Sequence, residues 1–179
     1  MGKVNNLLKL NLGCGTDIRK GWLNIDACAL QGVDIACDLS KESVPLPDQS
    51  ASYICCRDVL EHFDYLPLMK EISRLLAPGG IVEIRVPHFS YHRAYEDPTH
   101  RRYFSVNSFD FFTESHPRNY YFEIRFNAIS KKKITFLKKW YFPWNYLVEP
   151  LVNAGEKTMY IYEATFLRGM FPAENVIVE

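Results

Sequence analysis

The feature that most constrains this chain is a short apolar stretch that runs straight into a pair of glycines. Residues 7–12 have the composition of a buried strand, and Gly13, Cys14 and Gly15 follow at once. Glycine adopts backbone conformations that are closed to other residues, and it lets a ligand approach the main chain closely. A strand that ends in such a bend is typical of the ligand-binding edge of an open α/β sheet.

Three further apolar stretches also end in polar residues. They are 22–25 before Asp26, 33–37 before Asp38, and 51–56 before Arg57 and Asp58. In an open α/β sheet, ligands bind at the carboxyl ends of the strands, so we expect these polar groups to line one edge. Asp26 suits two ribose hydroxyls, because an ionised carboxylate accepts two hydrogen bonds.

One long helix and a fifth strand are predicted in the next part of the chain. Apolar residues at helical spacing predict a helix over 65–76, which the Pro-Gly-Gly run at 78–80 ends. Residues 81–86 are predicted to form the fifth strand. Alternating strands and helices imply right-handed crossovers and a parallel sheet. Only six residues separate Gly15 from Trp22, so the first helix is a single turn or absent.

The C-terminal part is expected to add antiparallel strands. Residues 122–137 are predicted to be a long strand or hairpin arm, and the alternation in 159–167 predicts another strand. Residues 143–155 are expected to form a loop with one helical turn. The predicted fold class is therefore α/β and Rossmann-like, with a mostly parallel sheet, an antiparallel C-terminal strand pair and a shortened first helix.

Composition excludes several classes of protein. The 179 residues carry 21 basic and 21 acidic side chains, so no global field attracts nucleic acid or an anionic membrane. Lysines cluster locally at 131–133 and 138–139, where a solvated strand edge or an anion-binding patch is expected. The five cysteines form no C-x-x-C pair, which favours reduced thiols. The N-terminus lacks a signal core, and no apolar stretch is long enough to span a membrane, so we expect a cytoplasmic protein.

The motifs resemble those of class I S-adenosylmethionine-dependent methyltransferases, and more narrowly the small bacterial methyltransferase type 11-like group. The resemblance covers roughly residues 8–110 and is carried by LNLGCG, GWLNID, PLPDQSASYICCRDVLEHF and LLAPGGIVEIRVP. It implies a single methyltransferase domain over 1–179. Within it, 1–87 forms the cofactor-binding half, 88–120 an acceptor-site insert and 121–179 the C-terminal strands.

The resemblance also implies S-adenosylmethionine as cofactor, with S-adenosylhomocysteine as product. Gly13 and Gly15 would contact its amino-acid part, Asp26 its ribose, Asp38 and Leu39 its adenine, and Arg57 and Asp58 would lie under its methionine end. Cys14 of the glycine bend and His62 of the VLEH segment complete the implied cofactor-binding set. Two features depart from the pattern. Asp17 stands where a third glycine is common, and Ile18 breaks the dinucleotide-binding fingerprint.

The segment 88–104 holds the densest run of functional side chains, and its histidines allow three interpretations. They satisfy hydrogen bonds of the loop, or His88 or His100 removes a proton from the acceptor, since imidazole titrates near neutral pH. In the third interpretation, His88, His92, Asp97 and His100 bind a metal ion. His88 and His100 are the predicted catalytic residues, and no metal ion is predicted.

Other side chains of this segment suit an acceptor. Arginine pairs with phosphate or carboxylate groups, and aromatic rings offer a face for stacking. The predicted substrate-binding residues are Tyr91, His92, Tyr95, Arg101 and Arg102. Surface charge is the structural alternative for the arginines, and a lid over the sheet edge is the alternative for the tyrosines.

The predicted function is methyl transfer to a small-molecule or glycan acceptor, at oxygen. The DPTHRRYF stretch resembles a segment that recurs in this group, including members encoded beside sugar-assembly enzymes, which suggests polysaccharide biosynthesis. A non-catalytic binding or scaffold protein that retains the fold is the alternative. A nucleic-acid methyltransferase is disfavoured by the neutral charge and by Arg57 and Asp58, which stand where base methyltransferases carry a D/N-P-P-Y/F run.

Overall fold

A computed structural model of the chain describes residues 7–179. Residues 1–6, part of the N-terminus predicted to lack a signal core, lie outside the described residues. The described residues form two compact units. The first runs to Leu60 and includes Asp64–Ile84, and the second comprises Glu61–Phe63 and Arg85–Glu179. Within residues 7–179, no helix is both long and apolar enough to cross a membrane.

Within residues 7–179, seven strands form one sheet in the order β3-β2-β1-β4-β5-β7-β6. Their bounds are β1 Leu8–Leu12, β2 Leu23–Asp26, β3 Ile35–Ala36, β4 Ala51–Arg57, β5 Leu76–Pro87, β6 Lys132–Thr135 and β7 Asn175–Val178. The pairs β1–β2, β1–β4 and β2–β3 are parallel, whereas β6 and β7 are antiparallel. The predicted fold class, a mostly parallel sheet with an antiparallel C-terminal pair, is confirmed.

The register of the first unit aligns the strand ends. Leu12, the last residue of β1, lies opposite Ile25 of β2 and Cys56 of β4. The residues that follow these positions therefore leave the sheet at the same edge. This is the edge at which the glycine bend and Asp26 were expected to meet.

The crossovers of the first unit are shorter than a doubly wound sheet normally has. Among the described residues, turns rather than helices connect β1 to β2, β2 to β3 and β3 to β4. The Asn24 amide braces the first connection: its oxygen accepts the Arg19 N–H at 2.9 Å, and the Asn11 amide donates to it at 3.1 Å. The predicted loss of the first helix is confirmed, and the expected alternation of strands and helices holds only between β4 and β5.

The helix α1 (Tyr65–Leu75) forms where the apolar spacing predicted it. Leu68, Met69, Ile72 and Leu75 are at most 1% exposed and make one buried face. The boundary after it differs from the expectation, because β5 begins at Leu76 and includes the Pro-Gly-Gly run. Pro78 disfavours helical geometry at Ala77, so the chain passes directly from helix to strand.

An ion pair within α1 also holds the loop before β4 through a backbone hydrogen bond. The Glu71 carboxylate accepts the Val44 N–H at 2.7 Å and two bonds from the Arg74 guanidinium at 2.7 and 2.8 Å. The hydrogen bonds from Arg74 are the main reason why the pKa of Glu71 lies below its usual value. Because the folded-state pKa is lowered, this contribution to stability is complete above the unfolded pKa and is lost as the pH falls through the folded value.

We therefore expect Glu71→Gln to lower the free energy of unfolding at pH 7 by about 2 kcal/mol, the typical worth of hydrogen bonds to a charged group. The difference from wild type should be smaller at about pH 3, because the unfolded chain then binds a proton at Glu71 more readily than the native ion pair does. Urea unfolding at both pH values measures the effect, with the exposed Glu42→Gln as control. A difference that does not change with pH would contradict the assigned ion pair.

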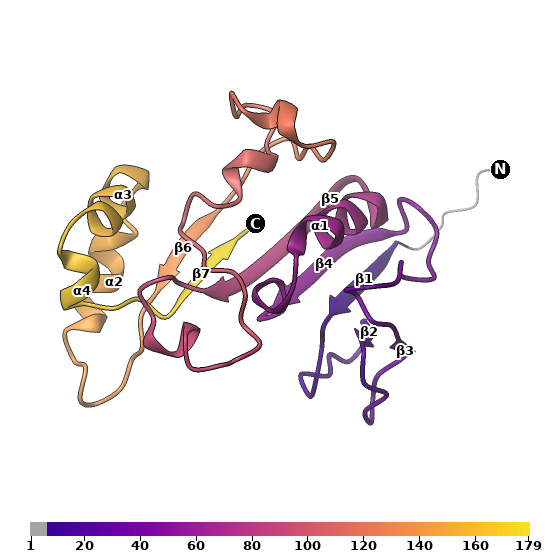
Figure 1. Cartoon of the computed structure of the whole chain (residues 1–179), viewed down its shortest axis with the longest axis horizontal. Helices are drawn as coiled ribbons and strands as arrows, with labels where there is room; N and C mark the ends of the chain where they lie inside the picture. Colours follow the sequence, from indigo (N-terminus) through magenta and orange to yellow (C-terminus); the bar gives the residue numbers. More distant parts are fainter. Residues whose placement is uncertain (1–6) are drawn as a thin grey trace. The chain divides into compact units, whose positions relative to one another are not determined.

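The second unit contains three short helices around one apolar cluster. They are α2 (Asn145–Val152), α3 (Glu156–Ala164) and α4 (Leu167–Met170), and Figure 1 shows them grouped together beside β6. The buried residues of the cluster are Val106, Ile134, Phe136, Val152, Met159, Tyr162 and Ala173.

Three sequence predictions for this unit are wrong. The segment 159–167 lies mostly in α3 instead of a strand, and it reaches only the first residue of α4. Residues 143–155 contain the full helix α2, and only Lys132–Thr135 of 122–137 forms a strand. The alternation at 159–167 was misleading because Met159 and Tyr162, three positions apart, are the residues that enter the core. The hydroxyl of Thr158 also accepts the Gly155 N–H at 3.0 Å, which caps α3.

The lysine cluster is largely engaged within the same unit. Lys133 and Lys138 both pair with the Glu149 carboxylate, at 3.2 and 2.9 Å, and Lys132 pairs with Asp110 at 2.8 Å. Burial alone would raise the pKa of Glu149, but these lysines outweigh it and hold that pKa below its usual value. Lys131 also pairs with Glu179, so four of the five lysines have internal carboxylate partners, which weakens the alternative of an anion-binding patch.

Candidate functional site

The glycine bend after β1 requires glycine at its first position. Gly13 and Gly15 have φ values of 62° and 49°, in the left-handed region. A Cβ on Gly13 would lie 2.3 Å from Cγ2 of Val59, whereas a Cβ on Gly15 would meet nothing within 4 Å. The bend is therefore closed by packing under Gly13 and open above Gly15, where a ligand could approach the main chain.

The carboxylate of Asp26 lies beside this bend, at the end of β2. Its Oδ2 accepts the Gly15 N–H at 2.7 Å, and its Oδ1 accepts the Cys28 N–H at 2.9 Å. Each oxygen keeps a further lone-pair position, so the group is oriented by backbone and can still accept two hydroxyl protons. Cys14 is 5% exposed, and its N–H donates to the Ile25 carbonyl at 3.1 Å, which fixes the bend against β2.

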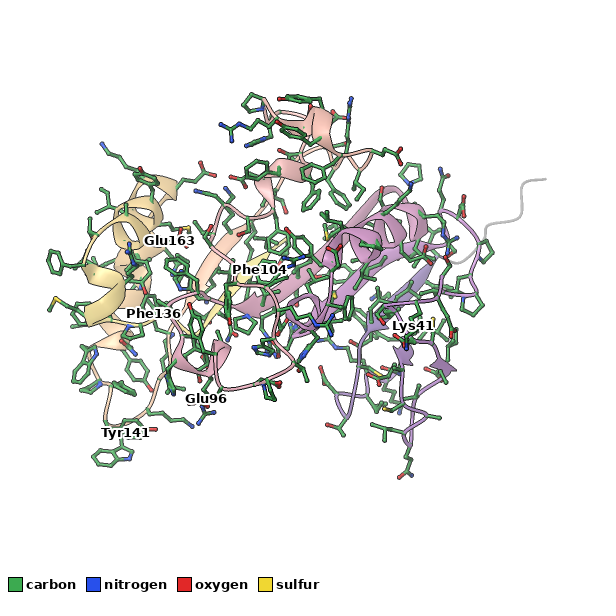
Figure 2. All side chains as sticks on the ribbon, viewed as in Figure 1. Lys41, Glu96, Phe104, Phe136, Tyr141 and Glu163 are labelled. Atoms are coloured by element: carbon green, nitrogen blue, oxygen red, sulfur yellow. The ribbon has the colours of Figure 1, made fainter. Side chains whose placement is uncertain are left out.

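Asp38, the predicted adenine contact, is bound to its own turn. Its Oδ1 accepts the Ser40 hydroxyl at 2.6 Å, and its Oδ2 accepts the Lys41 ammonium at 2.6 Å. Lys41 is labelled on the loops of the first unit in Figure 2. These bonds, with that from Lys41 the strongest, lower the pKa of Asp38 to about 2. Leu39, beside it, is half-buried.

Arg57, at the end of β4, pairs with Glu83 on β5. Its guanidinium donates to the Glu83 carboxylate at 2.6 and 2.7 Å, and the Tyr53 hydroxyl donates to the same carboxylate at 3.2 Å. Burial by itself would raise the pKa of Glu83, but Arg57 holds it below its usual value. Asp58, the next residue, is exposed and has φ 56°, a strained conformation for a residue with a side chain.

These groups of the first unit fit an adenosyl ligand. The fit rests on two observations, the open space above Gly15 and the oriented carboxylate of Asp26. The predicted set of Gly13, Cys14, Gly15 and Asp26 is brought together, with Arg57 and Asp58 following the adjacent strand β4. His62 belongs to the second unit.

His88, one candidate catalytic residue, is fully buried in the second unit. Its Nδ1 lies 2.8 Å from the Ser90 hydroxyl, and its Nε2 lies 3.0 Å from the Glu163 carboxylate. Glu163, labelled on α3 in Figure 2, also accepts the Val106 N–H at 2.8 Å. Both ring nitrogens of His88 thus have partners in the core, and the side chain is 0% exposed.

His100, the other candidate, lies beside His62, with ring centroids 4.8 Å apart. Its side chain is 10% exposed, and its Nδ1 is 2.9 Å from the Ala94 carbonyl. The Glu61 carbonyl accepts the N–H groups of Arg101 and Arg102 at 2.7 and 3.3 Å, which joins the two segments. The sequence interpretation did not assign Glu61 to the site, although the VLEH motif contains it.

The remaining predicted acceptor-binding residues are mostly at the surface. Tyr95 stacks on Tyr103 with centroids 4.4 Å apart, and the two are 57% and 48% exposed. His92 lies 3.5 Å from Glu96 and is exposed, so the proposed metal set of His88, His92, Asp97 and His100 is not assembled. Tyr91 is half-buried, and burial is the main reason why its pKa is raised. Arg101 and Arg102 are exposed.

Comparison with known proteins identifies the family. A sequence profile described as a methyltransferase domain matches residues 9–132. The chain belongs to the methyltransferase domain family. This membership confirms the class I S-adenosylmethionine-dependent methyltransferase recognised from the motifs. It likewise confirms the enzyme class and S-adenosylmethionine as the cofactor of that class.

Individual relatives agree with the fold. A dimethylglycine N-methyltransferase from Parasynechococcus marenigrum is 36% identical over 72 residues, which span 40% of this chain and 25% of that protein. A S-adenosylmethionine-dependent methyltransferase from Archaeoglobus fulgidus has a TM-score of 0.59 at 15% identity, covering 97% of this methyltransferase and 86% of that chain. A putative methyltransferase from Bacillus halodurans has a TM-score of 0.60 at 12% identity, with 97% and 91% covered.

Replacement of Asp26 by alanine should weaken binding of S-adenosylmethionine by about 1–3 kcal/mol, because charge-assisted hydrogen bonds to the ribose are lost. This corresponds to about a 5- to 150-fold rise in Kd. Isothermal titration calorimetry measures it. Asp48→Ala removes a carboxylate that is 73% exposed in the same unit and serves as control. Equal affinity of Asp26→Ala and wild type would show that the ribose lies elsewhere.

Proposed function

We propose that this methyltransferase transfers the methyl group of S-adenosylmethionine to an oxygen of a small-molecule or glycan acceptor. The observation that carries the proposal is the Asp26 carboxylate, oriented by two backbone N–H groups beside an open glycine bend. In this proposal the first unit binds the cofactor, and the second unit supplies the groups that bind the acceptor.

The cofactor supplies an activated methyl group on a sulfonium, so the protein mainly has to position the acceptor oxygen. Asp26 would hold the ribose hydroxyls, and the bend at Gly13, Cys14 and Gly15 would hold the amino-acid end. Asp38 and Leu39 would lie near the adenine. Because Ser40 and Lys41 already engage both oxygens of Asp38, we assign it a positioning role.

Removal of the acceptor proton is assigned to the histidine cluster around His100. A hydroxyl needs such help more than an amine does, because its proton must leave as the new bond forms. His88 is the weaker candidate, since it is 0% exposed and both its ring nitrogens have partners in the core. We assign His88 to the packing of the second unit.

A sugar ring is the acceptor class that the surface of the second unit favours. The stacked pair of Tyr95 and Tyr103 exposes aromatic area to solvent. The Tyr95 hydroxyl donates to the Phe89 carbonyl oxygen at 2.7 Å, which holds the ring in place. Tyr91, His92, Arg101 and Arg102 would add polar contacts, with the arginines suited to an anionic substituent. This is the basis for proposing a role in polysaccharide assembly.

The decisive experiment offers a panel of nucleotide sugars, lipid-linked glycans and amine metabolites to the enzyme with methyl-labelled cofactor. We expect a mass gain of one methyl group in a sugar-containing acceptor, and a smaller gain when Asp26→Ala is used at a cofactor concentration below its Kd. Labelling of an amine would replace the oxygen assignment. Cofactor binding without labelling of any acceptor would favour a scaffold protein.

A further inference from the structure

Three potential metal ligands converge in the second unit. Glu61, His62 and His100 offer one ligand atom each, and these atoms all lie within 4.8 Å of one another. Glu61 is 1% exposed and the His100 side chain is 10% exposed, so two of the three are taken out of bulk water. A buried carboxylate and two imidazoles form a donor set used by zinc and by non-haem iron sites.

The hydrogen bonds of His100 determine which of its nitrogens can bind an ion. Its Nδ1 lies 2.9 Å from the carbonyl oxygen of Ala94. A carbonyl only accepts, so Nδ1 must carry the proton. In the neutral ring the lone pair is then on Nε2.

The same reasoning applies to His62. Its Nδ1 lies 2.7 Å from the Thr99 hydroxyl oxygen, and that hydroxyl donates its own proton to Asp97 Oδ1 at 2.6 Å. Since a hydroxyl has one proton, Thr99 accepts from His62, and the lone pair of the neutral ring is again on Nε2. Metal-binding histidines typically donate their other N–H to a carbonyl or to a carboxylate-linked group in this way.

We propose that Glu61, His62 and His100 bind one divalent transition metal ion, with zinc as the reference ion. Ligand bonds of about 2.0–2.2 Å put neighbouring ligand atoms about 3.3 Å apart, so the three groups must close by at most about 1.5 Å. The bonds from Arg101 and Arg102 to the Glu61 carbonyl hold the two contributing segments in register. Three protein ligands leave at least one coordination position for a further group.

A role for the ion rests on the proposed function. A hydroxyl of the acceptor that occupied the open position would have its pKa lowered by the ion, and it would lose its proton more easily. The proton would pass to solvent, and the resulting alkoxide would attack the sulfonium methyl carbon while the bond from that carbon to sulfur breaks. His100 would then act as a ligand of the ion that promotes deprotonation.

Metal binding can be tested without cofactor or acceptor. The purified chain is depleted with a chelator, dialysed, and titrated with Co²⁺ while its visible d–d absorption is recorded, and then with Zn²⁺. We expect one ion per chain at saturation, a Co²⁺ band that Zn²⁺ displaces, and at least 100-fold weaker binding by His62→Ala and His100→Ala. His92→Ala removes an exposed histidine of the same unit and should bind like wild type.

Thr99→Val gives a subtler test that keeps all three ligands. It removes the acceptor of the His62 Nδ1 proton, so affinity should fall about 10- to 100-fold. Circular dichroism checks that each variant is folded. Absence of a saturable Co²⁺ band in folded wild type would overturn the site, as would equal affinity of wild type and His100→Ala. If the ion binds but chelation leaves methyl transfer unchanged, the role in deprotonation is overturned while the site stands.

Discussion

Replacing His100 by glutamine should lower kcat for methyl transfer to a hydroxyl acceptor by about 10²-fold to 10⁴-fold, the usual contribution of assistance to removal of the acceptor proton. Glutamine retains a polar end that can still meet the Ala94 carbonyl, so the fold should be preserved. Affinity for S-adenosylmethionine should be unchanged, because the proposed cofactor ligands belong to the first unit.

The matched controls are two other histidines of the second unit. His92→Gln alters a side chain that is 65% exposed; as a proposed acceptor contact it should raise KM for the acceptor and leave kcat within about twofold of wild type. His88→Gln should lower the free energy of unfolding more than it lowers kcat, because the ring is fully buried between Ser90 and Glu163. If His88→Gln remains folded but loses as much kcat as His100→Gln, the assignment of the two histidines is reversed.

Replacing Gly13 by alanine should lower the free energy of unfolding by about 2–5 kcal/mol. Left-handed backbone costs a residue with a side chain about 1–2 kcal/mol, and forcing a methyl group against packed atoms costs about 1–3 kcal/mol more. The clash is specific, since the new Cβ would lie 2.3 Å from Cγ2 of Val59. Urea unfolding measures the change.

Gly15→Ala separates the two causes. Gly15 has φ 49°, also in the left-handed region, but a Cβ there meets nothing within 4 Å. Gly15→Ala should therefore lower the free energy of unfolding only by the cost of left-handed backbone, about 1–2 kcal/mol. Val59→Ala in the Gly13→Ala background should recover part of the loss, because it removes the atom that clashes. Equal stability of the two glycine variants would show that Val59 does not close the bend.

Sequence patterns predicted the first unit well because the signals there are local. Each strand is short and apolar, a polar residue or glycine follows it, and α1 shows its buried face in the spacing of Leu68, Met69, Ile72 and Leu75. The missing first helix also followed from a local quantity, the six residues between Gly15 and Trp22. Because parallel strands end at the same edge of a sheet, the sequence also predicted that these polar residues lie near one another.

The second unit was harder to predict because tertiary contacts outweigh local patterns there. The alternation at 159–167 predicts a strand, yet Met159 and Tyr162 become buried as one face of a helix against Phe136 and Val152. Tyr160 remains 62% exposed, so its apolar character carried no information about burial. Helix or strand was decided by which residues found partners in the core.

The amino-acid sequence alone determined the family, the mostly parallel sheet and the groups suited to an adenosyl ligand, because these depend on residues a few positions apart. Only the tertiary structure separated His88 from His100. It buries the first beside Glu163 and brings the second to Glu61 and His62. The physical reason is that segments distant in sequence determine the burial and the hydrogen-bond partners of each histidine. The spacing of residues within 88–104 therefore cannot predict them.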